Sequence, residues 1–146
     1  MPVVALTYAL VADDALDPSV ADPQSPGIDL YARRPVTIAA GRQVTVDTGV
    51  AFALPDDKMG LIWDKSSVAV RRQLSTEAGV IDTGYRGTVR VVLRNLGDRA
   101  CTLERGDAVA QMVLTTAWQP RLLKTNNGID VNTVRGTRGF GGINQV

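Results

Sequence analysis

The stretch Gln43-Val-Thr-Val-Asp-Thr48 alternates apolar and polar residues. Val44 and Val46 fall on one side of an extended backbone and Thr45 and Asp47 on the other, which is typical of a half-buried strand. Similar short β-prone runs, separated by Gly, Pro and Asp, occur on both sides of this stretch. They are Val3–Leu10, Val36–Ile38, Val50–Leu54, Gly60–Trp63, Thr88–Asn95, Cys101–Leu103 and Val109–Thr115. This spacing predicts an all-β sandwich or barrel.

One segment departs from the β pattern. Ser66–Arg72 is a candidate helical turn that a serine could cap, and a polar loop is an equal alternative. With 146 residues, 45% of them hydrophobic, the chain is long enough to bury one substantial core but short for two domains. Its formal net charge of +1 offers no global field for a nucleic-acid polymer or an anionic membrane. We therefore expect an anionic ligand to be bound by a local group of residues.

The residue types present exclude several classes of site. The absence of histidine removes Ser-His triads, Cys-His pairs and histidine metal sites, so general-base work falls to a carboxylate. Cys101 is the single cysteine, and we expect it to be a buried apolar residue rather than part of a disulfide. The first residues lack a basic stretch, and no apolar run approaches the roughly 18 residues of a membrane span. We expect a cytoplasmic protein without a membrane partner.

The character of the chain changes beyond Trp118. Pro120 and an Asn-Asn-Gly turn lead to Arg135-Gly-Thr-Arg-Gly-Phe-Gly-Gly142, in which four of eight residues are glycine. We therefore expect a β domain over residues 1–120, followed by a C-terminal strand or linker and a flexible arm over residues 121–146. Composition alone favours a frayed end over an arm that closes on a ligand.

Two segments could carry chemistry. Lys65-Ser66-Ser67 follows an apolar run, and a strand that ends in a cation and two hydroxyls offers donors for phosphate oxygens. Ala78-Gly-Val-Ile-Asp-Thr-Gly-Tyr-Arg-Gly87 predicts a hairpin whose glycines let the backbone approach a flat ligand. Taken singly, a solvated basic turn and a plain Asx turn are the better interpretations.

Two polar residues lie among apolar neighbours. Gln111, in the segment Arg105–Leu114, must find a hydrogen-bond partner or face solvent. Asp29 lies between Ile28 and Leu30, so on an extended strand it faces away from both. Either residue could be structural.

Together, in their order and spacing, these segments resemble the five motifs of the homotrimeric dUTPase family. Pro26–Ala32 is similar to A-G-x-D-L, Lys65–Ala69 to R-S-G-L-A, Ala78–Gly87 to A-G-V-I-D-x-D-Y-R-G, and Gly106–Gln111 to G-D-R-I-A-Q. Arg135–Gly141 resembles the glycine-rich C-terminal motif of the family. The resemblance extends over residues 26 to 142, nearly the whole chain.

The resemblance implies a jelly-roll β-barrel or sandwich that assembles as a homotrimer, with each active site built from three subunits. The implied reaction is hydrolysis of dUTP to dUMP and pyrophosphate by water attack on the α-phosphorus, which limits uracil incorporation into DNA. Asp82 would activate the water, because a carboxylate is already ionised at neutral pH. The base and sugar would be bound by Gly79, Val80, Ile81, Tyr85 and Phe140, with Tyr85 excluding a 2′-hydroxyl and Phe140 stacking on uracil.

Phosphate binding would lie in other segments. The residues implied are Lys65, Ser66, Ser67, Gln111, Arg135 and Arg138. Mg²⁺ would be bound mainly by the substrate phosphates, and Asp29 would reach it through water. The glycine-rich tail would then be an arm that closes the site.

This chain departs from the family pattern at several positions. Gly142 and Ile143 replace the usual Ser-Thr, so Arg138 is the candidate to supply charge at the γ-phosphate. Lys65 replaces the more frequent arginine and loses its bidentate geometry. Asp64 brings a negative charge near the expected phosphates, and we expect its side chain to point away.

Two other functions share this fold and parts of its motifs. A dCTP deaminase would need a glutamate on the strand after the hairpin, where this chain has Val92. A catalytically weak regulatory protein that binds nucleotides is supported only by the altered Gly142-Ile143 end. Nucleic-acid binding through Arg71 and Arg72 is less favoured, because two adjacent arginines usually form a solvated face.

Overall fold

The structure, a computed structural model, describes residues 2–138. Nearly all of its regular structure is β. The strands are β1 (Thr7–Leu10), β2 (Ser19–Val20), β3 (Gly27–Tyr31), β4 (Val36–Ile38), β5 (Gln43–Ala53), β6 (Lys58–Trp63), β7 (Leu74–Glu77), β8 (Val80–Ile81), β9 (Thr88–Asn95), β10 (Cys101–Leu103) and β11 (Ala108–Thr116). The described residues contain one helix, α1 (Ser66–Arg72).

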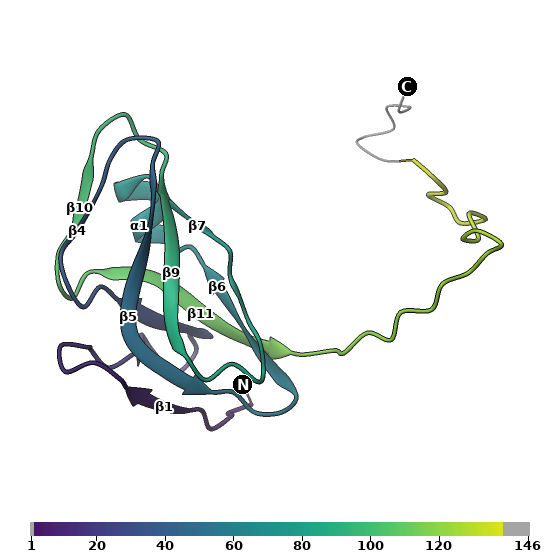
Figure 1. Ribbon diagram of the computed structural model, residues 1–146, viewed down its shortest axis with the longest axis horizontal. Coiled ribbons are helices and arrows are strands. Elements are labelled where there is room, and N and C mark those ends of the chain that lie inside the picture. The colour runs from purple at the N-terminus through teal and green to yellow at the C-terminus, as the bar shows by residue number, and fades with distance from the viewer. Residues whose placement is uncertain (1, 139–146) are drawn as a thin grey trace.

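The strands form two large sheets and a small one. One large sheet has the order β1-β5-β9-β7, the other has the order β2-β3-β11-β6-β8, and β10 pairs with β4. All pairings within residues 2–138 are antiparallel, and the sheets stay separate instead of closing into one barrel. Figure 1 shows β5 and β9 crossing in front of β11 and β6. The predicted all-β, jelly-roll-like fold is confirmed.

The core lies between the two large sheets. Most of its fully buried side chains come from alternate positions of β3, β9 and β11, as the period of two requires, and Ile38 joins them from the short strand β4. They include Leu30, Ile38, Val89, Val91, Leu93, Val109 and Met112. Cys101, expected to be buried, is only half-buried, because it lies on the short edge strand β10 and packs against the margin of the core.

Strand β5 differs from the sequence expectation. The runs around Val44 and Val50 form one strand of 11 residues, because Thr48-Gly49 makes a β-bulge instead of ending the strand. Gly49 adopts a φ of +70°, and Thr48 Oγ1 donates 2.7 Å to the carbonyl of Val89. Strand β7 is not among the predicted runs, because Leu74 is its single apolar residue.

The predicted helical turn is confirmed at Ser66–Arg72, but its cap differs. Lys65 occupies the N-cap position and makes no side-chain capping hydrogen bond, so the expected serine cap is wrong. Val68 is the one buried residue of α1, and Gln73 ends the helix with a left-handed φ of 54°. The helix therefore starts directly at the end of β6 and turns the chain into β7.

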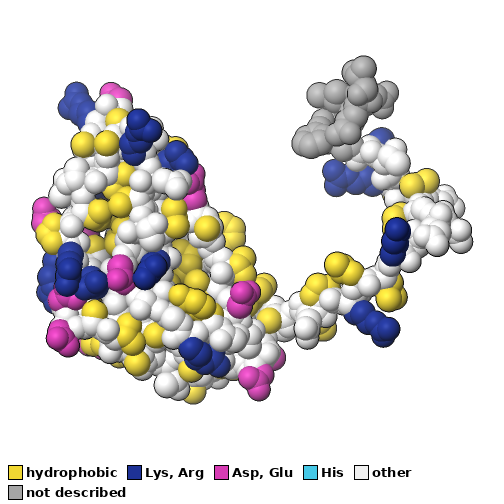
Figure 2. Space-filling model, in the orientation of Figure 1, with side chains coloured by type: hydrophobic (Ala, Val, Ile, Leu, Met, Phe, Trp, Pro, Cys, Tyr) yellow, Lys and Arg dark blue, Asp and Glu magenta, His cyan; other side chains and the backbone are white. Residues whose placement is uncertain are grey.

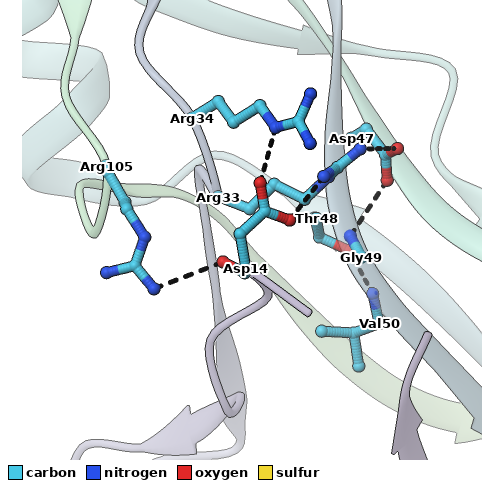
Figure 3. A network of polar contacts seen from close by, with 8 residues as sticks. All are labelled: Asp14, Arg33, Arg34, Asp47, Thr48, Gly49, Val50 and Arg105. Atoms are coloured by element: carbon cyan, nitrogen blue, oxygen red, sulfur yellow. Dashed lines mark hydrogen bonds and ion pairs between the residues drawn. The ribbon is translucent and has the colours of Figure 1, made fainter. Parts of the chain in front are cut away.

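A polar network fastens the N-terminal loop to the sheets (Figure 3). Asp14 accepts hydrogen bonds of 2.5 Å from both Arg33 and Arg34, and Arg33 also reaches Asp47 at 3.0 Å. Arg105 donates to the backbone carbonyl of Asp14 at 3.3 Å. Four segments that are far apart in the sequence are thereby connected.

Beyond β11, the described chain runs away from the sheets without helix or strand (Figure 1). Hydrophobic side chains lie exposed along this segment (Figure 2). They are Trp118, Leu122, Leu123, Ile129, Val131 and Val134. Within residues 2–138, no helix is long and apolar enough to cross a membrane.

Candidate active site

A row of side chains crosses the outer face of the five-stranded sheet. Ser19, Asp29, Gln111 and Trp63 are in register on the adjacent strands β2, β3, β11 and β6. Because residues paired across neighbouring strands point to the same face, this row faces away from the core that contains Leu30. Two of the predicted site residues, Asp29 and Gln111, are therefore direct neighbours.

Lys65 reaches this row from the end of β6. Its Nζ lies 2.7 Å from both Oδ1 and Oδ2 of Asp29. The side chains of Lys65 and Asp29 are 27% and 13% exposed, so the pair is largely shielded from water. The cation predicted for phosphate and the carboxylate predicted for the metal thus bind each other in the free protein.

Gln111 is held in place from two sides. Its Nε2 donates a hydrogen bond of 2.9 Å to the carbonyl of Asp64, so this amide has the partner that the sequence requires. Its Oε1 lies above Gly27, where a Cβ atom would approach it to 2.1 Å. The Asp64 carboxylate accepts a hydrogen bond from the Thr76 backbone N–H at 2.6 Å, so it points toward β7, as predicted.

Ser66 and Ser67 complete this group. Both are exposed at the first positions of α1, directly after Lys65. The first N–H groups of a helix have no partner within it, so hydroxyl and backbone donors of these serines are available together. We call Asp29, Lys65, Ser66, Ser67 and Gln111 the phosphate cluster.

The second group of predicted residues lies on the glycine-rich segment Ala78–Gly87. The predicted pairing of its two arms is wrong, because β8 pairs with β6 whereas β9 pairs with β5 and β7, so the segment crosses from one sheet to the other. We keep the name hairpin for this turn between β8 and β9. Strand β8 pairs with β6 through Gly60↔Ile81 and Leu61↔Val80. At Gly79, a Cβ atom would lie 2.8 Å from the carbonyl of Ile62, so the glycine serves close approach to β6. Thr83 Oγ1 donates 2.7 Å to the carbonyl of Lys58 and fastens the turn.

Asp82 and Tyr85 lie at the tip of this hairpin. The Tyr85 N–H closes the turn on the Asp82 carbonyl at 3.0 Å, and both side chains are exposed. The Tyr85 hydroxyl donates 3.0 Å to the carbonyl of Thr88, and the ring lies across Gly87, where a Cβ atom would be 2.5 Å from the hydroxyl oxygen. The hairpin therefore presents an open carboxylate beside a fixed aromatic ring.

The hairpin and the phosphate cluster lie at opposite ends of β6. Continuing the β6–β8 register places Asp82 opposite Met59, six residues before Lys65. At about 3.3 Å per residue, the two positions are separated by about 20 Å. One nucleotide α-phosphate cannot contact both groups of a single chain.

The remaining predicted residues belong to the C-terminal segment. Arg135 and Arg138 donate to each other's carbonyls at 3.0 Å and form a local turn away from the sheets. Phe140, Gly142 and Ile143 lie outside the described residues. The single-chain structure does not bring Arg135 and Arg138 to either group.

A metal ion fits this arrangement only if a bound phosphate ligand supplies most of its coordination. Residues 2–138 contain no group of three Asp, Glu, Cys or His side chains placed to hold a metal. Asp29 is the carboxylate of the phosphate cluster, and the carboxylate of the nearby Asp64 is turned to Thr76 instead. Mg²⁺ commonly binds through one or two carboxylates plus substrate phosphates, which matches this donor set.

Sequence reasoning missed several residues that shape the site. The Asp64 carbonyl acts through the backbone, which leaves no signal in residue type, and Thr83 through a hydroxyl whose partner, the Lys58 carbonyl, is 25 residues away. Gly27 could have been found, because a glycine inside a strand often marks close approach of another group. Trp63 could have been found, because an aromatic residue followed by a polar run ends an apolar strand. It is 58% exposed and lies next to Gln111.

Comparison with known proteins agrees with these observations. The family model described as dUTPase matches residues 13–142. The deoxyuridine 5′-triphosphate nucleotidohydrolase of Mycolicibacterium vanbaalenii is 37% identical over 128 residues, covering 86% of this chain and 83% of that protein. Its counterpart in Yarrowia lipolytica is 36% identical over 143 residues, covering 97% of this chain and 91% of that protein.

Solved structures show the same fold. A dUTPase of Staphylococcus bacteriophage 80alpha with dUpNHpp has a TM-score of 0.86 at 22% identity, covering 94% of this chain and 97% of that one. A dUTPase from phage phi11 of S. aureus, described with a structural Mg(II) ion, has a TM-score of 0.77 at 22% identity. It covers 84% of this chain and 97% of its own.

Proposed function

Because this chain belongs to the dUTPase family and hydrolyses dUTP to dUMP and pyrophosphate, we propose that Asp82 activates the attacking water. The observation that supports this role is the exposed position of Asp82 on a hairpin pinned to β6 through Gly79 and Thr83. A carboxylate held at a fixed turn can accept a proton from water as the water attacks the α-phosphorus. The deaminase and the regulatory alternatives are not favoured by these relatives.

The same hairpin selects the base and the sugar. The backbone of Gly79, Val80 and Ile81 offers N–H and C=O groups to the uracil edge. Tyr85 lies against the deoxyribose and leaves no room for a 2′-hydroxyl, since its ring is fixed across Gly87 and its hydroxyl is bound to the Thr88 carbonyl. A fixed ring discriminates by shape, as rigid pockets do.

The phosphate cluster of a neighbouring copy holds the triphosphate. The support is the distance of about 20 Å between Asp82 and Lys65 along β6, which a single chain cannot close. A cyclic homotrimer would bring the hairpin of one copy to the cluster of the next. Ser66, Ser67, Lys65 and Gln111 then supply the donors for the phosphate oxygens.

Mg²⁺ accompanies the substrate in this proposal. The triphosphate supplies most of its ligands, and Asp29 faces it through water. The ion, when bound, offsets charge on the pyrophosphate leaving group. The chain's own contribution is to hold the phosphate chain with Ser66 and Gln111 so that the α-phosphorus faces the water at Asp82.

The C-terminal arm closes the site. Arg135 and Arg138 bind the γ-phosphate, and Phe140 stacks on uracil and excludes bulk water. The extended course of residues 117–138, with six exposed apolar side chains, supports an arm that packs on another copy of the chain.

Pyrophosphate release tests the proposed role of Asp82. The assay compares dUTP, dTTP, dCTP and UTP, each with and without Mg²⁺, for the wild type and Asp82→Asn. We expect turnover of dUTP alone, lost in Asp82→Asn and retained in the control Asp98→Asn, an exposed carboxylate between β9 and β10. Ammonia release from dCTP would support a deaminase instead, and nucleotide binding without turnover would support a regulatory protein.

A further inference from the structure

Lys65 forms an ion pair with Asp29 within the chain itself. Its Nζ lies 2.7 Å from both carboxylate oxygens of Asp29, and neither side chain is more than 27% exposed. A carboxylate shielded from water is costly unless it is paired, so Asp29 depends on this cation. Its neighbours in the row, Ser19 and Gln111, carry no charge. Among residues 2–138, Lys65 is the cation that forms a salt bridge with Asp29.

The proposed function gives each of these two residues a different binding partner. It assigns Lys65 to a phosphate oxygen and Asp29 to the waters of Mg²⁺, whereas here the two side chains direct two N–H donors and both carboxylate oxygens at each other. We propose that Lys65 and Asp29 form a charge-exchange pair, which parts only when a metal and a triphosphate arrive together. This inference rests on the proposed function of the site.

Each ligand alone meets an unfavourable charge. A metal-free triphosphate that draws Lys65 away leaves Asp29 as a bare carboxylate beside the phosphates. A free divalent ion at Asp29 would displace Lys65 and leave an unpaired ammonium next to it. When both bind, the ammonium moves to a phosphate, the carboxylate faces the metal, and each charge keeps a partner.

The identity of the cation suits this exchange. Lysine is a compact charge on a flexible four-carbon stem, so it can swing between two acceptors. Arginine would grip both oxygens of Asp29 with a planar fork and would be harder to release. A lysine at position 65, where the family motif more often has arginine, therefore favours release of Asp29 when the ligands bind.

Calorimetric binding of the non-hydrolysable analogue dUpNHpp tests the pair. The quantity compared is the ratio of the Kd measured in EDTA to the Kd measured in excess Mg²⁺. Asp29→Asn frees Lys65 for phosphate and removes the opposing carboxylate, so we expect this ratio to fall by about tenfold, mainly through tighter metal-free binding. Lys65→Met leaves Asp29 bare, so we expect the ratio to rise by about tenfold, through weaker metal-free binding.

A second measurement does not involve nucleotide. Mn²⁺ added to the protein alone is followed by electron paramagnetic resonance. We expect Lys65→Met to bind Mn²⁺ more tightly than the wild type does, and the double variant with Asp29→Asn to lose that gain. Equal Mn²⁺ binding by the wild type and Lys65→Met would overturn the exchange.

Charge-matched controls come from the Asp14–Arg34 pair, which lies outside the phosphate cluster. Arg34→Met and Asp14→Asn should leave the Kd ratio unchanged. If Asp29→Asn weakens metal-free binding as Lys65→Met does, the exchange is wrong. Asp29→Asn alone decides the question if Lys65→Met does not fold, because a freed lysine can extend to solvent. A wild type that binds no dUpNHpp would overturn the proposed function as well, whereas binding with unchanged ratios overturns the exchange alone.

Discussion

The Oε1 atom of Gln111 lies 2.1 Å from the position that a Cβ atom on Gly27 would take. Gln111 crosses the backbone of β3 at this point while its Nε2 donates to the carbonyl of Asp64. Any side chain at position 27 must therefore push the amide out of its place. The glycine two residues before Asp29 leaves the space in which the glutamine of the phosphate cluster is held.

Gly27→Ala should consequently lower dUTP turnover through Gln111. We expect kcat/KM to fall about tenfold or more, roughly 1.4 kcal/mol of transition-state stabilisation. A double-mutant cycle measures the dependence: on a Gln111→Ala background, Gly27→Ala should cost almost nothing, because the displaced group is already absent. Additive losses would show that Gly27 acts independently of Gln111. Thermal melting of each variant separates this effect from unfolding.

Mixing inactive variants tests whether each active site is shared between copies. Asp82→Asn destroys the hairpin half of a site, and Gln111→Ala destroys the phosphate half. Because the halves lie about 20 Å apart in one chain, the proposed homotrimer would, in hybrids of the two variants, contain sites with both halves intact. Random mixing of equal amounts after reversible unfolding should restore about a quarter of wild-type activity. A single-chain site would regain none, and each variant refolded alone is the control.

Much of the fold could be predicted from the sequence because period-two alternation marks strands wherever one face is buried. The alternation around Val44 and the run Thr88–Asn95 both correspond to strands of the structure. Prediction was poorest where local residue types conflict with tertiary pairing. Thr48-Gly49 resembles a strand end, yet the Val89 carbonyl and a positive φ convert it into a bulge.

The sequence predicts individual residues of the site, but not which of them contact one another. Resemblance to family motifs marked Asp29, Lys65, Gln111 and Asp82, and the structure groups the first three. The Lys65–Asp29 pair could not be foreseen, because it joins residues 36 positions apart through the order of strands β3, β11 and β6. The role of Gly27 likewise depends on a diagonal neighbour on another strand.

Substitution of Gly87 should weaken sugar discrimination. A Cβ atom there would lie 2.5 Å from the Tyr85 hydroxyl oxygen, so Gly87→Ala must move the ring away from its place. We expect the ratio of kcat/KM for dUTP over UTP to fall about tenfold or more, since our proposal has the ring exclude the 2′-hydroxyl by shape. Tyr85→Phe keeps the ring and loses only the bond to Thr88, so it should retain most of the ratio. Equal loss in both variants would assign discrimination to the hydroxyl instead.

Removal of residues 135–146 should impair closure of the site. The truncated chain loses Arg135, Arg138 and Phe140, so we expect a lower kcat with dUTP and weaker binding of dUpNHpp in Mg²⁺. Arg135→Ala with Arg138→Ala, which keeps the length of the arm, should reproduce the loss in binding if charge is responsible. Unchanged turnover in the truncated chain would remove the arm from the mechanism.

Asp14 should make the fold sensitive to acid. Hydrogen bonds from Arg34 and then Arg33 lower the pKa of Asp14 to about 2, from an ordinary value of 3.8 (Figure 3). Because the folded pKa is the lower one, this contribution to stability is fully present above about pH 4 and is lost as the pH falls toward 2. Asp14→Asn should therefore melt at a lower temperature than the wild type at pH 7, and the difference should shrink between pH 4 and pH 2. The exposed Asp98→Asn serves as the control with little difference at either pH. A difference for Asp14→Asn that persists unchanged to pH 2 would indicate lost packing of the loop, rather than the lost charge.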